Sequence, residues 1–563
     1  MTGNTRLKAV ALAIYLLIIP FVLYFKLSPT IVNSPITDLL FLALLFSLAV
    51  LLVYGSFLIR KSLDVYLLLP QTLMIAFIVR AASYLKFSGT VLLDSYYHMV
   101  TTTNILSFGV ANPQLSWWYY NVQNQLYWPL MHLLTATTVL TSGIDVGLVF
   151  KFQEPLLGAL FVLAAFILAK LVIKSDGAAL LSAIVALSAE TTILFQSEYH
   201  PQGLAFVLFV FLVYAFLKLR VTKNRLMYSV FLIFLAAFVL SHHFSSLFIG
   251  LFAIVVMVTP FALMRVPRIR PEFRKLLKEV SRDYRIWLLI IGPVLAYQAL
   301  GYYYFASQVI RYVMSAAHTP QVLTVGVQVP LLYTASNAVQ YVFLLLAAVS
   351  LLLTVRTQDI TRVRCAVLAA VFIIVGFFGN YAGALPLDRT IGFYTPLGAI
   401  FVAFTVYSIK DQWFLSVNKS LKTGLLIAVI CMTLVAGVVN SQVPSVFFKD
   451  SGANPFYFSS NDLSSINRLN TSGTWINQHV DQKSRIAVEF DTQTAVFYYG
   501  RHAAFVYTEQ GLSANYIKQV GAEYVVVNPS IPYAAGFNKT AYLNRIDVVY
   551  DDGRVNAGKV NTQ

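Results

Sequence analysis

The sequence predicts an all-α polytopic membrane domain followed by a small extracytoplasmic α/β domain. Hydrophobic residues make up 58% of the 563 positions and charged residues only 11%, and the mean hydropathy is +0.71. Long apolar runs fill residues 1–440 and then stop. A soluble protein is about 25% charged and cannot bury this much apolar surface, so the composition excludes a purely soluble enzyme. The 14% aromatic content also opposes disorder.

Apolar runs long enough to cross a bilayer define the membrane domain, because a hydrocarbon core of about 30 Å needs about 20 helical residues. We expect about thirteen spans. Their predicted ranges are 9–25, 37–59, 63–85, 147–173, 177–195, 202–219, 226–241, 244–264, 286–307, 330–355, 364–384, 390–409 and 423–440. The segment 126–141 is shorter and carries Pro129 and His132, so it is expected to be a re-entrant or juxtamembrane helix that does not cross.

The net charge of +16 reports membrane orientation. Residues 441–563 balance ten Lys/Arg against ten Asp/Glu, so the whole excess lies in 1–440. A cytoplasmic N-terminus places most of these cations in inner loops, the densest from Arg265 to Arg285. The basic residues flank spans and form no soluble basic face, so nucleic acid is not expected as a partner.

This orientation predicts a multi-pass plasma-membrane protein with its polar turns on one side. The segments expected outside are the loop 87–125, the turns at 196–201 and 241–244, the loop around Asp388 and the C-terminal region.

Residues 441–563 form the predicted soluble domain. Short β-rich runs at 485–489, 503–507, 524–528 and 545–550 alternate with helical stretches near 463–480, 492–499 and 511–520. Strands that alternate with helices predict a small α/β domain. No glycine-rich phosphate loop is present in this region.

The first external loop holds the leading catalytic candidates. Asp94 and His98 are four residues apart, so on a helix they share one face. A carboxylate at the outer end of a span is costly without a partner or a function, although a helix N-cap is the plain structural alternative. Trp117 and Trp118 follow in the same loop and could stack on a sugar, or simply belong to an interfacial aromatic belt.

Two further turns carry imidazoles. Glu198 and His200 alternate at one outer junction between spans, and the adjacent His242 and His243 lie at the next. Carboxylate with imidazole suits Zn, Mn or Fe, or proton transfer. A divalent metal such as Mn or Mg is the cofactor expected if the site binds one. Of the adjacent pair, one histidine is expected to cap a helix while the other ligates or hydrogen-bonds.

Asp388 and Arg389 occupy the last external loop. Arginine grips phosphate bidentately, so Arg389 is a candidate phosphate ligand, and an Asp388–Arg389 surface pair is the alternative. Lys151 and Glu154 lie in the outer half of a span and could pair at i,i+3, a role interpreted as structural.

The chain resembles the GT-C superfamily of integral-membrane glycosyltransferases. Leu93-Asp94-Ser-Tyr-Tyr97-His98 is similar to the family's first external loop, in which an acidic residue opens a juxtamembrane helix. Leu126-Tyr-Trp-Pro129-Leu-Met-His132 is similar to its next, non-crossing segment, and Glu198-Tyr199-His200 to its second acidic motif. Many polyprenyl-phosphate-dependent members also end in a small external α/β domain.

The resemblance implies transfer of a sugar from a polyprenyl-phosphate donor to a glycan, lipid or protein acceptor. Asp94 would act as general base with His98 beside it, and Arg389 would stabilise the leaving phosphate. Glu198 and His200, with Asp94, would hold any metal, and Asp388, His242, His243 and the Trp117–Trp118 pair would contact substrate. The Trp-Trp-Asp signature of oligosaccharyltransferases is absent from the C-terminal region, and the acidic motif follows the third span instead of the first.

Two other classes remain open. A transporter or flippase of a lipid-linked or polar solute would favour internal repeats, midplane charge pairs and broken helices. No clear repeat is present, and the polar residues gather on one face. The third class is a structural membrane protein with a sensing domain.

Overall fold

A computed structural model describes most of the membrane helices and the core of the C-terminal sheet. The described residues are 3–27, 35–86, 93–109, 128–197, 199–267, 270–297, 347–350, 359–381, 387–412, 419–442, 471, 473–481, 484, 486–488, 505–507, 521, 523–527, 546–551 and 556–560.

The chain divides into two compact units. The first comprises Met1–Ala82, Tyr127–Met131 and Lys151–Val443, and the second comprises Ser83–Leu126, His132–Phe150 and Pro444–Gln563. The segment around Asp94 therefore belongs to the second unit, together with the C-terminal region.

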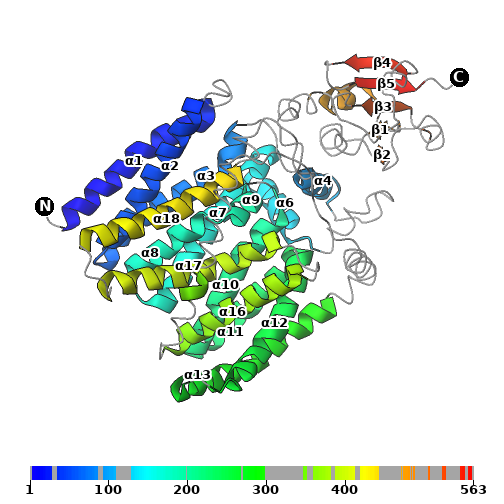
Figure 1. Ribbon diagram of the computed structural model, residues 1–563. Helices are drawn as coiled ribbons and strands as arrows, with labels where there is room; N and C mark the ends of the chain where they lie inside the picture. Colours follow the sequence, from blue (N-terminus) through cyan, green and yellow to red (C-terminus); the bar gives the residue numbers. More distant parts are fainter. Residues whose placement is uncertain are drawn as a thin grey trace. The chain divides into compact units, whose positions relative to one another are not determined.

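Helices account for almost all of the described part of the first unit (Figure 1). In chain order they are α1 (Gly3–Leu27), α2 (Pro35–Leu58), the 3-10 helix η1 (Ser62–Leu67), α3 (Leu69–Lys86), α7 (Val146–Ile173), α8 (Asp176–Leu187), α9 (Glu190–Gln196), α10 (Pro201–Thr222), α11 (Arg225–Ser241), α12 (His243–Met264), α13 (Pro271–Ser281), α16 (Ile360–Tyr381), α17 (Leu387–Gln412) and α18 (Lys419–Gln442).

Seven helical segments among the described residues are long and apolar enough to cross a membrane. They are Thr5–Tyr24, Leu40–Leu58, Ser62–Ala82, Val146–Ile173, Pro201–Thr222, Phe244–Met264 and Ile391–Ser408. Five shorter apolar helices accompany them, including Arg225–Ser241 and Tyr284–Tyr297. The polytopic character is thus confirmed, while the count of thirteen stays a prediction. Most of the expected span 330–355 lies outside the described residues.

The core of the first unit lies around α8. Every residue from Gly177 to Leu187 is buried, and the helix packs on α2 and α17. Close approach is possible because Gly177 has no side chain: a Cβ there would lie 2.7 Å from the Ser56 carbonyl oxygen. The Tyr407 hydroxyl donates to that same carbonyl over 2.7 Å.

The predicted span 177–195 is not one helix, and this prediction was wrong. α8 stops at Leu187, and α9 starts again at Glu190 after a short irregular link. The apolar run gives no sign of this break because both pieces are apolar. Main-chain groups that a break frees inside a membrane need partners from within the protein.

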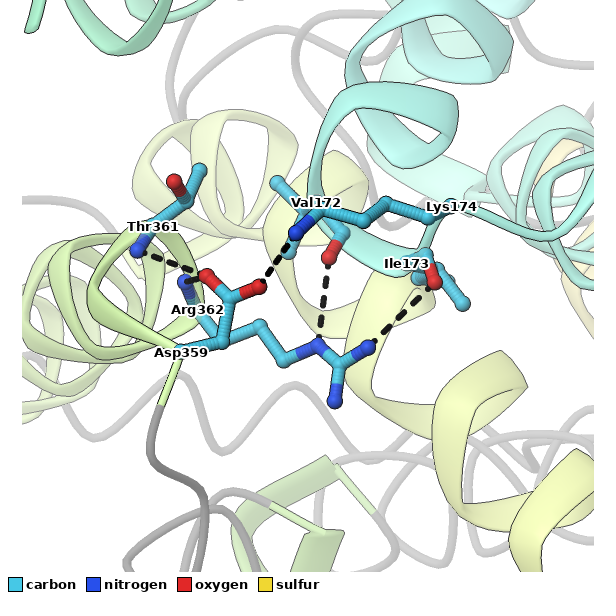
Figure 2. A network of polar contacts seen from close by, with 6 residues as sticks. All are labelled: Val172, Ile173, Lys174, Asp359, Thr361 and Arg362. Atoms are coloured by element: carbon cyan, nitrogen blue, oxygen red, sulfur yellow. Dashed lines mark hydrogen bonds and ion pairs between the residues drawn. The ribbon is translucent and has the colours of Figure 1, made fainter. Parts of the chain in front are cut away.

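A polar clamp joins the end of α7 to the start of α16 (Figure 2). Lys174 takes the left-handed conformation (φ 64°) that ends α7, and its Nζ lies 2.7 Å from Asp359 Oδ2. Asp359 Oδ1 accepts hydrogen bonds from the backbone N–H of Thr361 (2.9 Å) and of Arg362 (3.3 Å), so it caps α16.

The Arg362 guanidinium completes the clamp from the other direction. Its Nε donates to the Val172 carbonyl over 3.2 Å and its Nη2 to the Ile173 carbonyl over 3.4 Å. These are two of the last carbonyls of α7, which have no partner inside the helix. Side chains at the start of α16 and at the end of α7 thus provide hydrogen-bond partners for one another's helix ends.

Among its described residues the second unit contains the helices α4 and α6 and a further helix over 473–479, beside the strands. α4 spans Leu93–Phe108 and α6 spans Leu130–Ser142, of which the part from His132 onward belongs to this unit. With 13 residues, α6 is about 20 Å long, which is too short to cross a bilayer core of about 30 Å. This agrees with the non-crossing helix expected at 126–141.

A five-stranded mixed sheet forms the C-terminal region, with strand order β2-β1-β3-β5-β4. Its strands are β1 (Ile486–Val488), β2 (Phe505–Tyr507), β3 (Tyr524–Val527), β4 (Ile546–Asp551) and β5 (Asn556–Val560). β1 pairs in parallel with β2 and β3, while β5 runs antiparallel to β3 and β4.

The first four strands coincide with the β-rich runs in the sequence, whereas β5 was not predicted. β5 reads Asn-Ala-Gly-Lys-Val, in which only Val560 belongs to the β-branched and aromatic residues that mark a strand, while Asn, Ala, Gly and Lys are depleted in strands. The helices expected at 492–499 and 511–520 lie outside the described residues, so the complete α/β assignment stays a prediction.

Candidate functional site

Asp94 and His98 lie on α4 as the sequence predicts. Asp94 is the second residue of the helix and His98 follows one turn later. A carboxylate in the first turn is favoured by the positive end of the helix dipole. The Asp94 side chain lies outside the described part of the structure, whereas His98 is buried.

His98 contacts a second imidazole, that of His132 on α6. The two ring centroids are 5.3 Å apart with an edge-to-face angle of 68°. His132 is completely buried, and among the described residues neither of its ring nitrogens has a hydrogen-bond partner. A buried polar group without a partner is costly. The sequence named His132 only as a feature of the short segment, whereas the structure places it against His98 of the Asp94 helix.

Two predicted external turns meet in the first unit. His200 is the N-cap of α10, and its Nδ1 accepts a hydrogen bond from the Gln202 backbone N–H over 3.1 Å. His242 is the N-cap of α12, where Nδ1 accepts from the Ser245 backbone N–H over 3.4 Å. The two rings lie side by side, with centroids 5.6 Å apart. The expectation that one of His242 and His243 caps a helix is confirmed, and His242 is that residue.

The cap contacts bear on the tautomers of these rings. Nδ1 of His200 faces the Gln202 N–H, whereas Nδ1 of His242 lies near both the N–H and, at 3.0 Å, the hydroxyl of Ser245. A nitrogen that accepts a backbone hydrogen bond carries no proton, so in a neutral ring the proton is on Nε2. Metal ligation through Nε2 would require the opposite tautomer and would break the cap. With these cap bonds formed, the proton of each neutral ring lies on Nε2, beside a helix N-terminus that favours negative charge.

A buried arginine, Arg80, forms hydrogen bonds with the segment that precedes the His200 turn. Arg80, at the end of the span formed by η1 and α3, is completely buried. Its Nε donates to Gln196 Oε1 over 2.8 Å and its Nη1 to the Leu187 carbonyl over 3.3 Å. Its Nη2 lies 3.4 Å from Thr192 Oγ1. Arg80 therefore bridges the break between α8 and α9, which directly precedes the turn at His200.

Gln196 connects Arg80 to the first turn of α10. Its Nε2 donates to the Gly203 carbonyl over 3.4 Å. Gly158 on α7 leaves the room in which Arg80 lies, because a Cβ at position 158 would collide with the arginine Cδ and Nε. Sequence reasoning placed Arg80 only as a cation in the outer half of a span. Its charge inside an apolar run was the signal that pointed to a buried role.

Glu154 is a second buried charge-bearing group in the same region. It is completely buried, and among the described residues neither carboxyl oxygen has a hydrogen-bond partner. A Cβ at Gly203 would collide with Glu154 Oε2 and would lie 2.7 Å from the Phe195 carbonyl oxygen. The i,i+3 ion pair that Lys151 and Glu154 could have formed is absent from the described structure, because neither Glu154 oxygen has a partner there.

The remaining predicted site residues are described only in part or not at all. Asp388 and Arg389 lie in the first turn of α17, and His243 is the first residue of α12, but their side chains lie outside the described structure. Glu198, Trp117 and Trp118 also lie outside it. Within the described residues no three His, Cys, Asp or Glu side chains form a group that could hold a metal.

Comparison with known proteins identifies the fold. No protein-family model matches the chain and no curated protein matches it in sequence. The structure is similar to ArnT from Cupriavidus metallidurans bound to undecaprenyl phosphate, with a TM-score of 0.52 and 9% identity over 87% of this chain and 98% of ArnT. ArnT in the apo state gives a TM-score of 0.50 and 10% identity over the same shares. The chain thus shares its fold with ArnT over most of its length, as expected from its resemblance to GT-C proteins.

Proposed function

We propose that the protein is a GT-C-type membrane glycosyltransferase that acts at the external face of the plasma membrane. It transfers a sugar from a polyprenyl-phosphate donor to a glycan, lipid or protein acceptor. The observation that carries the proposal is the shared fold with ArnT, a protein bound to undecaprenyl phosphate, over 87% of this chain.

Asp94 is the proposed general base. An acceptor hydroxyl is a poor nucleophile, and a carboxylate that takes its proton contributes about 10²–10⁴-fold. The acceptor oxygen then bonds to the anomeric carbon as the bond from that carbon to the phosphate oxygen breaks. Direct displacement inverts the anomeric centre. His98, one turn along α4, orients Asp94, and its contact with His132 fixes the position of its ring.

The phosphate leaving group needs positive charge. Arg389, in the first turn of α17, is the proposed ligand, and electrostatic stabilisation of this type can contribute about 3–4 kcal/mol. The capped N-termini of α10 and α12 add N–H donors from His200 and His242. His243, Asp388 and the Trp117–Trp118 pair are proposed sugar or acceptor contacts, while the apolar helices flank the polyprenyl tail.

A divalent metal such as Mn or Mg is a further part of the proposal. The carboxylates of Glu198 and Asp94 suit a hard cation, which would neutralise charge on the donor phosphate. His200 fits this ligand set less well, because its Nδ1 already accepts the cap hydrogen bond from Gln202.

Transfer from a panel of radiolabelled polyprenyl-phosphate sugars, with and without EDTA, tests the function directly. Asp94→Asn should abolish transfer while the protein stays folded. Asp145→Asn is the matched control, because Asp145 is likewise an aspartate at a helix N-terminus. It is exposed, and its Oδ1 accepts from the Leu148 N–H over 3.2 Å, a role that asparagine retains. Normal activity of the Asp94→Asn enzyme would remove Asp94 from the base role.

A flippase of lipid-linked solutes is the alternative, and the break between α8 and α9 favours it because transporters use broken helices. The same donor panel in sealed liposomes separates the two. A flippase moves the donor across the bilayer with the sugar–phosphate bond intact, whereas a transferase releases polyprenyl phosphate.

A further inference from the structure

A basic cavity lies at the end of α10 that is remote from His200. The cavity has a volume of about 710 Å³, and its polar lining comes from Arg220, Lys223, Tyr228, Arg282, Tyr284 and Arg285. α10 contains 22 residues and is therefore about 33 Å long. Since this length matches a bilayer core of about 30 Å, the cavity and the His200 turn lie at opposite membrane surfaces.

The charge of the cavity is only partly neutralised. Arg220 forms an ion pair with Asp283 (Nη2 to Oδ1, 2.6 Å), and Asp283 also pairs with Arg364 (2.8 Å). Within the described structure, Lys223, Arg282 and Arg285 have no carboxylate within ion-pair distance. An excess of positive charge therefore remains around the opening, and it suits an anionic ligand.

The surrounding elements place the cavity at the level of lipid headgroups. α10 ends at Thr222, α11 begins at Arg225, and an apolar helix starts at Tyr284. Residues at the ends of three apolar helices thus line the cavity. Tyrosines at this level are typical of a membrane–water interface, and here Tyr228 and Tyr284 add hydroxyls beside the cations.

The neighbouring helix α13 extends the positive surface. Its apolar side chains Phe273, Leu277 and Val280 are buried, and the helix packs on α12 and α16. The cations Lys275 and Lys278 on the same helix are exposed. Basic groups gathered beside a bilayer attract anionic lipid.

We propose that this cavity binds the phosphate headgroup of an anionic phospholipid from the adjacent leaflet. Arg282 and Arg285 supply the planar donors that match phosphate oxygens, and Lys223 supplies a point charge. The apolar side chains of Leu219 and Ile286 also line the cavity and suit the first carbons of the acyl chains. This site is independent of the proposed transferase chemistry.

Native mass spectrometry of the full-length protein, released from nanodiscs of phosphatidylcholine with phosphatidylglycerol, tests the proposal. The wild type should retain bound phosphatidylglycerol. The combined variant Lys223→Gln, Arg282→Gln, Arg285→Gln should bind it more weakly by about tenfold or more, since each cation near an anionic surface contributes several-fold. The control Arg6→Gln, Lys8→Gln, Lys61→Gln removes the same charge from other exposed positions and should bind like the wild type.

Equal retention by the cavity variant and the control would overturn the proposal. A third arm adds millimolar inorganic phosphate to protein in phosphatidylcholine alone and to the phosphatidylglycerol sample. Phosphate that binds without anionic lipid, or that displaces the lipid, would assign the cavity to a soluble phosphate compound instead. Size-exclusion profiles and the single variant Arg285→Gln confirm that a loss of lipid does not come from misfolding.

Discussion

Arg80 Nε donates to Gln196 Oε1 over 2.8 Å, and this contact ties an arginine inside one span to the end of the short helix before the His200 turn. Arg80→Met should destabilise the protein by about 2–5 kcal/mol, because the Leu187 carbonyl and the Gln196 amide lose a buried donor. Thermal or denaturant unfolding in detergent measures the loss.

Arg80→Lys keeps the positive charge but removes the planar guanidinium group. It therefore tests whether the hydrogen-bond geometry of the guanidinium matters in addition to its charge. A single ammonium cannot replace bonds to Gln196, Leu187 and Thr192 together. We expect intermediate stability and a reduced kcat for transfer. Wild-type stability in the methionine variant would contradict the bridging role.

Gly203 is the second testable position. Gly203→Ala places a methyl group against Glu154 Oε2 and 2.7 Å from the backbone carbonyl of Phe195, which cannot move easily. We expect a loss of about 1–3 kcal/mol and only partial recovery when Glu154→Ala is added. Gly424 on α18 is the matched control, since nothing lies within 4 Å of its Cβ position. Gly424→Ala should be neutral or slightly stabilising.

The cap at His200 separates a structural role from metal ligation. His200→Asn retains a side-chain acceptor for the Gln202 N–H and should leave stability within about 0.5 kcal/mol, whereas His200→Ala should lose about 1 kcal/mol. Unfolding curves of the two variants give this difference. If instead both variants lose bound Mn²⁺ equally while their stabilities match, His200 acts as a ligand and not as a cap.

The clamp at Asp359 predicts a pH dependence. Burial raises the pKa of Asp359, but hydrogen bonds from Lys174 and from the backbone of Arg362 and Thr361 outweigh it, so the pKa lies below its ordinary value of 3.8. A group with a lowered native pKa stabilises the fold above the unfolded value and loses that contribution as the pH falls through the native value. As the pH drops below about 4, the free energy of unfolding of the wild type should therefore decrease. Asp359→Asn should not show this decrease.

Unfolding measured between pH 7 and pH 3 checks this prediction. At pH 7 the Asn variant should be less stable by about 0.5–1 kcal/mol, because asparagine keeps the helix cap and loses an ion pair to the exposed Lys174. Lys174→Gln, which keeps the carboxylate cap, should lose a similar amount. Parallel pH curves for the wild type and Asp359→Asn would contradict the assignment.

Hydrophobic runs and turn positions were readable from the sequence because they depend on local pattern. The long spans, the short helix after Pro129 and four of the five strands follow from apolar length or β-rich composition. The break after Leu187 was not readable, because its stabilisation comes from Arg80, more than 100 residues earlier in the chain. Strand β5 was also missed, since its pairing with β3 and β4 replaces local propensity.

The candidate site also has features that the sequence predicts and features that only the structure shows. Imidazoles at polar turns were visible in the sequence, but only the fold shows that His200 and His242 lie against one another and that His98 contacts His132. Tautomers could not be predicted, because they depend on which backbone N–H each ring accepts. The convergence of Asp94, Glu198 and Arg389 on one external pocket stays a prediction.

The position of α8 has a consequence for biogenesis. The helix is enclosed on every side, and one of the helices that covers it, α17, begins at Leu387, about 200 residues after α8 ends. A ribosome that adds about 5–20 residues per second reaches that point roughly 10–40 s later. During this interval α8, which is buried along its whole length in the finished protein, has only lipid or an insertion factor where α17 will pack. The nascent chain is therefore more exposed to membrane proteases until its last third has been made.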